Sequence, residues 1–437
     1  MSDVSAPSEI TAVERAGHWQ SAAHRKRLRR RYAADRRLRF LGLGAIGLAI
    51  GLLGILIASL AYTGYLAFAQ TRVELEFYID PALVKSDDVR AGNFRSITRQ
   101  ALLAHFPEVT NRRQQTQLAK LLSPGAEWIV RDRVVAHPEL VGNTIKMLVP
   151  VADPYDQLNK GLIRRDGPEP QRRLDDEAIG WFDKLDQAGL IHTTFAFELF
   201  VNADSRFPEM AGLAGAIAGS FMTLLVCLLL SFPFGIAAAV YLEEFAPKNR
   251  LTALIEVNIN NLAAVPSIVF GLLGLAVFLG FFGLPRSAPL VGGMVLALMT
   301  LPTIIIATRA TLKSVPPSIR EAALGIGASK HQVILHHVLP LAMPGIMTAT
   351  IIGLAQALGE TAPLLLIGMN AFIPSLDSVG LLEPATALPT QIYSWADSPE
   401  RGFVTRTSAA ILVLLGFLVV MNAAAIYLRQ KFERTWS

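Results

Sequence analysis

The feature that most constrains this chain is a set of six apolar runs, each long enough to cross a bilayer as a helix. They lie at residues 40–68, 211–241, 262–282, 288–308, 341–367 and 407–428. About 20 apolar helical residues span a hydrocarbon core of roughly 30 Å. In lipid every backbone polar group must find its partner inside the protein, which helices achieve within one segment. The sequence therefore predicts an all-α polytopic membrane protein with six transmembrane helices.

The distribution of Lys and Arg predicts how these helices are oriented. If the N-terminus is inside, basic residues fall on the inner side in every short connection, at Arg25, Lys26, Arg27, Arg29, Arg30, Arg31, Arg36, Arg37, Arg39, Lys248, Arg250, Arg309, Lys313, Arg320, Lys330, Arg429, Lys431 and Arg434. Acidic residues crowd the outer connection after the fifth run, at Asp377, Glu383, Asp397 and Glu400. This is the positive-inside pattern. It predicts that the basic segment 1–39 and the tail 431–437 are both cytoplasmic.

The basic segment before the first run has two alternative interpretations. Runs of Arg also suit nucleic-acid phosphates. Alternatively, Arg36-Arg37 and a cleavage-like Ala67-Phe68-Ala69 are typical of an export signal. The apolar run between them is much longer than the roughly 15 residues of a signal core. Basic residues beside a membrane are each attracted to anionic lipid by about 1 kcal/mol. We therefore expect residues 40–68 to be an uncleaved anchor, with membrane lipid and no nucleic acid as a partner.

Residues 69–208, between the first and second runs, differ from the rest in composition. Residues 73–79 alternate apolar and polar side chains at period two, which predicts a strand. Helical spacing occurs near residues 96–105, 111–122 and 175–188, and loops are expected at Asp153-Pro154, Asp166-Gly167-Pro168 and Pro170. The sequence predicts a small inserted α+β domain on the outer, periplasmic side. Its scattered charges indicate no catalytic or metal site, and its role is not indicated.

Polar residues and prolines interrupt the later runs. They are Asn258, Asn260, Asn261, Pro266 and Ser267 at the third, Thr300, Pro302 and Thr303 in the fourth, and Gly359 to Pro363 in the fifth. Proline removes a backbone donor and its ring obstructs the preceding turn. The freed carbonyls must find partners in protein or in a water-filled cavity. A lone membrane proline is usually a tolerated kink, but several beside polar residues favour helices that line a passage.

Two charged residues in or near the runs are candidates for that passage. Glu360 lies in the fifth run toward the outer side. A charge at the bilayer centre costs about 2.5–3.5 kcal/mol on insertion scales, so it normally faces the bundle interior. The alternative for Glu360 is a structural salt bridge or a protonated carboxyl. For Arg309, at the inner end of the fourth run, the alternative is a side chain that extends to the membrane interface, as long basic side chains commonly do.

A polar loop at residues 310–340 joins the fourth and fifth runs. Its pattern predicts a short helix, a turn at Gly325 to Gly327, and a second helix that runs into Pro340. We expect this hairpin to lie just beneath the membrane. Such a hairpin is typical of a binding site for another protein on the inner side.

The residues of this loop resemble a known family. Glu321-Ala322-Ala323, Gly327 six residues after the Glu, and Leu339-Pro340 match the cytoplasmic signature of type I ABC importer permeases. His337 departs from that signature, which usually has an aliphatic residue there. Residues 261–271 and 357–365 further resemble the phosphate-uptake permeases of the PstA type. The resemblance covers residues 209–430, and the preceding extension resembles one found in only some members.

The resemblance implies one subunit of a heteromeric phosphate importer in the bacterial inner membrane. Its expected partners are a second, related permease (PstC type), an ATPase dimer (PstB type), a periplasmic phosphate-binding protein (PstS type) and inorganic phosphate. In this family the helix from Glu321 to Gly327 docks on the ATPase, so Glu321, Ala322, Ala323, Gly327, Leu339 and Pro340 are the expected coupling residues. The chain has no Gly-rich lysine loop for a nucleotide. We therefore expect no enzyme activity and no bound cofactor, with ATP used by the partner subunit.

The expected translocation-pathway residues are Glu360, Thr361, Arg309, Gln356, Ser267 and Thr303. Arg309 matches a family arginine, whereas Gln356 stands where family members often have Arg, four residues before Glu360. Hydrogen phosphate carries an O–H donor and sulfate does not, so Glu360 as an acceptor is expected to favour phosphate. Two alternatives remain. One is a permease for another oxyanion such as sulfate or molybdate, and the other is a membrane sensor with a periplasmic domain.

Overall fold

The computed structural model describes residues 22–85, 88–165, 169, 172–376 and 380–432. The expected loop at residues 166–168 and Pro170, and most of the expected C-terminal tail, lie outside the described residues. The described residues up to Leu60 and those from Ala61 onward form separate compact units. The first unit contains most of the long helix α2 (Ala22–Gly64), and the second contains everything that follows it.

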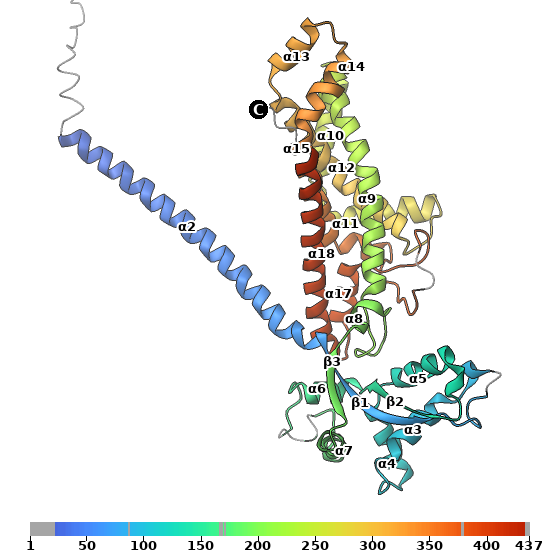
Figure 1. Ribbon diagram of the computed structural model, residues 1–437. Coiled ribbons are helices and arrows are strands. Elements are labelled where there is room, and N and C mark those ends of the chain that lie inside the picture. Colours follow the sequence, from blue (N-terminus) through green and yellow to red (C-terminus); the bar gives the residue numbers. More distant parts are fainter. Residues whose placement is uncertain (1–21, 86–87, 166–168, 170–171, 377–379, 433–437) are drawn as a thin grey trace, which may run out of the picture. The chain divides into compact units, whose positions relative to one another are not determined.

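The α+β domain after α2 is built on a three-stranded antiparallel sheet of order β2-β1-β3 (Figure 1). The central strand β1 (Ala69–Tyr78) pairs with β2 (Thr144–Pro150) and β3 (Ile191–Phe195). Val73, Leu75 and Phe77 of β1 are buried, while the residues between them face outward, which confirms the strand predicted from period-two alternation. The helices of this region are α3 (Phe94–Leu103), α4 (Arg112–Leu118), α5 (Gly125–Ala136), α6 (Asp153–Asn159), α7 (Asp176–Gln187) and α8 (Glu198–Val201).

One predicted loop in this region is a helix instead. Asp153 and Pro154 begin α6 rather than interrupting the chain. Proline is tolerated in the first helical turn because its missing N–H has no intrahelical partner there. The helices expected near residues 96–105, 111–122 and 175–188 are confirmed as α3, α4 and α7.

Five described helices are long and apolar enough to cross a membrane, and a bent pair makes six if it counts as one span. The five comprise α2, α9 (Ala214–Val240), α12 (Pro289–Ser314), α15 (Leu339–Gly359) and α18 (Gly402–Phe432), some with adjoining turns. The bent pair consists of α10 (Arg250–Ala263) and α11 (Ser267–Leu273), which continues as a π-helix to Phe281. These elements confirm a polytopic helical membrane protein with an inserted α+β domain.

The third span, predicted at residues 262–282 with an interruption at Pro266 and Ser267, is a bent pair of helices that begins earlier, at Arg250. Its two parts meet at an angle of 105° across residues 264–266. Pro266 is extended, with ψ 140°, and it directly precedes α11. Residues before a proline are also pushed away from helical geometry, which explains why α10 ends at Ala263.

The predicted interruption of the fourth span is wrong. Helix α12 runs unbroken through Pro302. The Thr300 hydroxyl donates to the carbonyl groups of Leu296 and Ala297 within the same helix, so it satisfies itself locally. Membrane helices tolerate prolines when neighbouring groups compensate for the freed backbone. The predicted interruption of the fifth span is confirmed, because α15 ends at Gly359 and α16 (Ala362–Leu366) follows.

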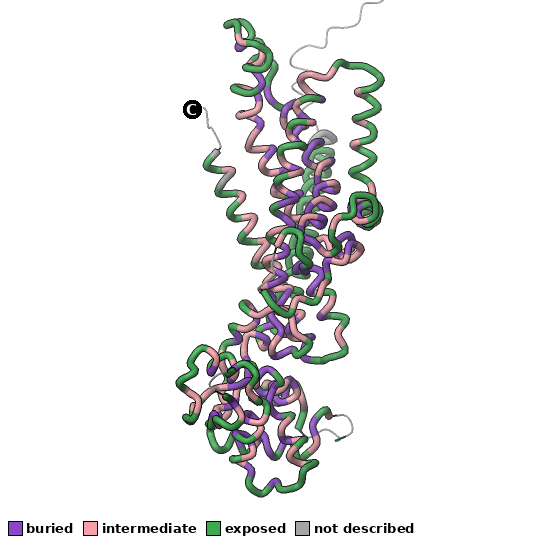
Figure 2. The backbone as a smooth tube through the Cα atoms, turned by 90° about the vertical axis from the view of Figure 1, so that its right-hand side faces the viewer, coloured by how far each residue is buried: buried purple, intermediate pink, exposed green. Residues whose placement is uncertain are grey.

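The core of the bundle lies where α12 packs between α9 and α15. Its buried side chains include Leu224 and Cys227 of α9, Val291 and Val295 of α12, and Phe270 of α11. Figure 2 shows buried residues along the inside of the bundle and inside the α+β domain. Many large apolar side chains on the outside of the helices are exposed, as expected for helices surrounded by lipid.

Candidate functional site

The breaks in the third and fifth spans lie against each other. Helix α11 packs on α16, and a Cβ placed on Gly271 would lie 2.7 Å from the Cα atom of Pro363. Only a residue without a side chain allows two backbones to approach this closely. Segments that are more than 90 residues apart in sequence are thereby brought together. They carry Ser267 on one side and the stretch from Glu360 to Pro363 on the other.

Glu360 occupies the connection between α15 and α16. Its backbone is extended (φ −77°, ψ 116°), and its N–H donates to the carbonyl of Ala357 at 3.3 Å. The side chain is half-buried, and the structure gives its carboxylate no hydrogen bond or ion pair with any described residue. The carbonyl of Thr361 accepts from the N–H of Leu365 at 3.0 Å and so begins α16. Glu360 is therefore an available acceptor at a break in the bundle.

The other pathway candidates differ in their surroundings. Gln356 is exposed on the last turn of α15, one turn before Glu360. Ser267 is half-buried as the first residue of α11, beside the Gly271–Pro363 contact. Thr303 is half-buried on α12, and the structure records no specific contact between its side chain and Glu360.

Arg309 is not brought to Glu360. Helices α12 and α15 are in register at Thr311 and Gly345, because a Cβ on Gly345 would lie 2.3 Å from the Thr311 side chain. Glu360 lies 15 positions beyond Gly345, and a rise of 1.5 Å per residue makes this separation about 22 Å along the helix. Arg309 and Glu360 therefore belong to opposite ends of the bundle.

Two carboxylates compensate the charge of Arg309. Its Nε lies 3.3 Å from Oε2 of Glu243, and its Nη2 lies 2.7 Å from Oε1 of Glu256. This pairing favours a structural role for Arg309 over the predicted role in the translocation pathway. Neither Glu243 nor Glu256 was predicted. The signal for Glu243 was a Glu-Glu pair in an inner connection, where the positive-inside pattern would otherwise favour Lys or Arg.

The predicted coupling loop forms a helix, a turn and a longer helix. In α13 (Pro317–Gly325), Glu321 and Ala322 are exposed, and Ala323 is 5% exposed. Gly327 follows in the left-handed region with φ +87°, which glycine adopts without strain. The predicted turn at Gly325 to Gly327 is confirmed.

The predicted second helix, which runs into Pro340, is confirmed from Lys330 onward, but it does not end there. Helix α14 (Lys330–Val333) continues through a π-helical segment, Ile334–Val338, into α15, so one helix runs from Lys330 to Gly359. Leu339 and Pro340 lie inside this continuous helix rather than at its end. Ser329 begins it with a capping box in which Ser329 and Gln332 bond reciprocally.

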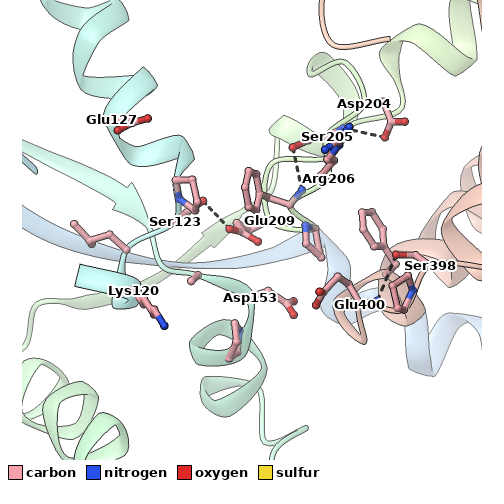
Figure 3. Close-up of a pocket in the computed structure, with 18 of the residues that line it drawn as sticks. Lys120, Ser123, Glu127, Asp153, Asp204, Ser205, Arg206, Glu209, Ser398 and Glu400 are labelled. Carbon is pink, nitrogen blue, oxygen red and sulfur yellow. Dashed lines mark hydrogen bonds between the residues drawn. The ribbon is translucent and has the colours of Figure 1, made fainter. Parts of the chain in front are cut away.

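A cleft of about 1170 Å³ separates the α+β domain from the outer ends of the spans (Figure 3). Arg95, Lys120 and Arg206 line it together with Glu209 and Glu400, so its walls carry both signs of charge. This mixture points to no single class of ligand.

Glu209 is the most buried carboxyl group of the cleft, with 4% of the residue exposed. The Ser123 hydroxyl donates to its Oε1 at 2.6 Å, and Figure 3 shows this bond. Its Oε2 has no partner among the described residues. Burial raises the pKa of Glu209 to about 7, although the Ser123 bond opposes this shift.

Two family models match the chain. Residues 231–434 match the model described as "Binding-protein-dependent transport system inner membrane component". Residues 25–169 match a domain of unknown function (DUF3333). The first match covers most of the bundle, and the second covers α2 and a large part of the α+β domain.

Several curated proteins are similar to the bundle. The "Phosphate transport system permease protein PstA" of Xylella fastidiosa is 30% identical over 240 residues, which are 54% of this chain and 82% of the relative. The protein of the same name from Pasteurella multocida is 31% identical over 237 residues, covering 54% and 83%. "Phosphate transport system permease protein PstA 1" of Mycobacterium tuberculosis is 32% identical over 218 residues, covering 50% and 70%.

Solved structures of ABC transporters are more distantly similar. A chain of the MetNI methionine ABC transporter in an inward-facing conformation is 18% identical with a TM-score of 0.39, covering 51% of this chain and 98% of that chain. A chain of a bacterial ABC transporter involved in alginate import is 17% identical with a TM-score of 0.40, covering 51% and 80%.

Proposed function

Because this chain belongs to the family of PstA phosphate transport permeases, we propose that it forms half of the membrane pathway of an ATP-driven phosphate importer. The observation that carries the proposal is the similarity to phosphate permeases over 82% of the Xylella fastidiosa relative. The chain is a multi-pass membrane protein and a non-enzymatic subunit of its transporter. Family membership implies a second permease, an ATPase and a substrate-binding protein as partners.

The finer assignment names these partners as PstC-type, PstB-type and PstS-type subunits. It places the complex in the bacterial inner membrane with both termini of this chain in the cytoplasm. ATP is hydrolysed by the separate ATPase subunit. The basic residues that fall on one side of the spans support this orientation.

The proposed pathway passes the meeting point of the two helix breaks. Glu360 is an acceptor without a described partner, next to Thr361 and just before α16, which packs on α11. Ser267 begins α11. A carboxylate here accepts the O–H of hydrogen phosphate, whereas sulfate at neutral pH offers no such donor. Glu360 is thereby proposed to discriminate between the two anions. Gln356 and Thr303 remain candidates on the neighbouring helices.

The proposed coupling element is the exposed face of α13. Glu321 and Ala322 are exposed there, and Leu324 and Ile326 are 52% and 84% exposed. Apolar side chains of this size at a helix end favour a protein partner over water. We assign this partner as the ATPase, with the small Ala322 allowing close approach.

Phosphate uptake by the reconstituted complex tests this function. The chain is co-expressed with its neighbouring reading frames, and labelled phosphate uptake is measured in proteoliposomes with sulfate or molybdate as competitors. We expect ATP-dependent uptake that neither competitor inhibits. Uptake of sulfate or molybdate in place of phosphate would replace the proposed substrate.

The role of Glu360 is tested by Glu360→Gln in the assembled complex. Loss of a hydrogen bond to a charged group is worth about 1.5–3 kcal/mol, so we expect phosphate uptake to fall at least about tenfold. Glu383→Gln, at an exposed outer position, is the matched control and should transport normally. An unchanged uptake rate with intact sulfate exclusion would remove Glu360 from the pathway.

A further inference from the structure

The inner end of α9 finishes in a single π-helical turn, Tyr241–Phe245, which we call the α9 π-turn. Such turns are rare and occur frequently at functional sites. Three consecutive side chains of this turn, Glu243, Glu244 and Phe245, each contact a different inner segment. The turn therefore touches both parts of the hairpin and the neighbouring span.

Glu243 connects α9 to α12 and, through α12, to α10. Its Oε2 lies 3.3 Å from Nε of Arg309 and 3.5 Å from Nζ of Lys313. Arg309 in turn reaches Glu256 of α10 at 2.7 Å. Glu243 and Arg309 together thus link the inner ends of α9, α12 and α10.

Glu244 connects α9 to the exposed helix α13. Its Oε1 lies 2.8 Å from Nη2 of Arg320, and the Glu244 side chain is 11% exposed. Arg320 also donates to the carbonyls of Leu312 and Val315, at 2.8 and 2.7 Å. The same guanidinium therefore holds α13 to the end of α12 and to the α9 π-turn.

Phe245 connects α9 to α14. Its ring centroid lies 4.9 Å from that of His331, and Nζ of Lys330 lies 5.2 Å from the Phe245 ring centroid. Contacts of Lys with an aromatic face are attractive at this distance. Both ends of the hairpin are thereby attached to adjacent residues of one turn.

The ion pairs of this cluster balance one another. Three carboxylates meet three cations, which are Glu243, Glu244, Glu256, Arg309, Lys313 and Arg320. Several of them are largely shielded from water, where the loss of one partner leaves an uncompensated charge. The cluster is therefore more than a set of weak surface pairs. Because all six charges are paired with one another, the cluster offers no free charge to a ligand. We therefore assign it the role of holding the inner helix ends together.

We propose that the α9 π-turn is the junction through which movement of the α13–α14 hairpin enters the transmembrane bundle, with Glu243 and Glu244 as positioning residues. This inference rests on the proposed function, because it requires an ATPase that moves the hairpin. The hairpin and the π-turn then move as one body. Displacement of α13 reaches α9 through Glu244, and α12 and α10 follow through Glu243 and Arg309.

The test is Glu244→Gln in the complete complex in proteoliposomes, with phosphate transported per ATP hydrolysed as the readout. A purely structural role would lower assembly, hydrolysis and transport together and leave this ratio unchanged. Coupling between sites typically amounts to 5- to 150-fold, and we expect the ratio to fall about tenfold while ATP hydrolysis persists. Lys248→Gln removes an exposed charge three residues beyond the turn and should keep the wild-type ratio. A wild-type ratio in Glu244→Gln overturns the proposal.

A second variant covers the case in which Glu244→Gln does not assemble. Glu244→Cys and Arg320→Cys together replace the ion pair with two thiols that a short bifunctional methanethiosulfonate can join. The native Cys227 is fully buried and does not interfere. We expect a low ratio of transport to hydrolysis in the reduced protein and recovery to near the wild-type ratio after cross-linking. A cross-link that leaves the ratio low, or a reduced protein with the wild-type ratio, overturns the proposal.

The same measurement on the wild-type complex distinguishes failure of this inference from failure of the proposed function. If the wild-type complex hydrolyses ATP without moving phosphate, the proposed function fails. If it transports phosphate and both Glu244 variants remain coupled, only the role of the α9 π-turn fails.

Discussion

Two glutamates near the outer ends of the spans have opposite surroundings. Glu360 is half-buried at a helix break and has no described partner, so it is open to a solute. Glu209 is buried between the α+β domain and the bundle, where Gln70 donates to its backbone carbonyl at 2.7 Å. Arg406 of α18 is also buried beside it, with Nη2 at 3.4 Å from the same carbonyl. Glu209 therefore helps to hold the α+β domain against the bundle and is not placed to bind a solute.

Glu209 makes the stability of this attachment depend on pH. Burial raises the pKa of Glu209 to about 7 in the folded protein, from the ordinary value of 4.5 for an exposed glutamate. The folded state therefore holds the proton more tightly than the unfolded state does. The contribution of Glu209 is fully present below about pH 4.5 and is lost as the pH rises to about 7. The change is about 3 kcal/mol at 1.36 kcal/mol per pKa unit. In Glu209→Gln we expect thermal unfolding to lose this part of the pH dependence, with a higher Tm than wild type at about pH 8.

The comparison uses purified protein in detergent at about pH 5 and about pH 8, with unfolding followed by fluorescence. At the lower pH the variant and the wild type should unfold at similar temperatures. Equal Tm differences between variant and wild type at both values would contradict a titrating Glu209.

At the scale of elements, the contact between α11 and α16 depends on one glycine. A side chain on Gly271 would meet the backbone of Pro363, which cannot rotate away. Gly271→Ala should therefore separate the two helices and destabilise the protein by about 1–3 kcal/mol, as overpacking typically does. We expect a lower Tm and slower phosphate uptake. Gly280→Ala is the matched control, since its nearest atom would lie at 3.5 Å, an ordinary contact, and it should behave as wild type.

Helix α13 is expected to contribute binding energy through its exposed end. Ile326 is 84% exposed and belongs to no hydrophobic core. Ile326→Ser should leave folding unchanged and weaken ATPase association by about tenfold, the effect of losing a moderate interface residue. Co-purification of the ATPase at graded concentrations measures this. Leu162→Ser, an exposed apolar residue of the α+β domain, is the control, and equal ATPase recovery from all three proteins would contradict the assignment.

Sequence patterns predicted those elements whose signal is local. The strand at β1 was predicted because Val73, Leu75 and Phe77 alternate with polar residues. The edge strand β3 was missed because its residues are half-buried or exposed, which leaves little alternation to read. The coupling turn was predicted because Gly327 marks a left-handed position.

Contacts between distant segments could not be predicted in this way. The pairing of Arg309 with Glu243 joins residues 66 positions apart, and only the packing of α9 on α12 brings them together. The contact between Gly271 and Pro363 likewise depends on the 105° bend before α11. Glu360 and Arg309 stood out in the sequence as charges in or near apolar runs. Their separation along the bundle became clear only from the way α12 packs against α15.

At the scale of the whole second unit, the α13–α14 hairpin and the α+β domain lie at opposite ends of the bundle (Figure 1). Asp153 of the domain lies directly against Gly402 at one end of α18, where an added Cβ would clash. Opposite ends of the bundle lie on opposite sides of a membrane, and the cytoplasmic hairpin and periplasmic domain stay a prediction from Lys and Arg.

That orientation is tested by labelling single cysteines in intact cells with a membrane-impermeant maleimide. We expect Asp397→Cys, an exposed outer residue, to react and Lys330→Cys to react only after permeabilisation. The buried Cys227 provides little background. Labelling of Lys330→Cys in intact cells would invert the topology and remove the hairpin from any cytoplasmic ATPase.

The continuity of the helix from Lys330 to Gly359 has a consequence for how far a disturbance travels. Its 30 residues extend for about 45 Å, the thickness of an entire bilayer with its headgroups. If the helix is shifted along its axis at the inner surface, Glu360 at its outer end therefore moves by nearly the same distance. Bending is expected at the π-helical segment Ile334–Val338 and at Pro340 and Pro344, all in the inner half of the helix, so the outer half from Gly345 to Gly359 translates as a rigid rod.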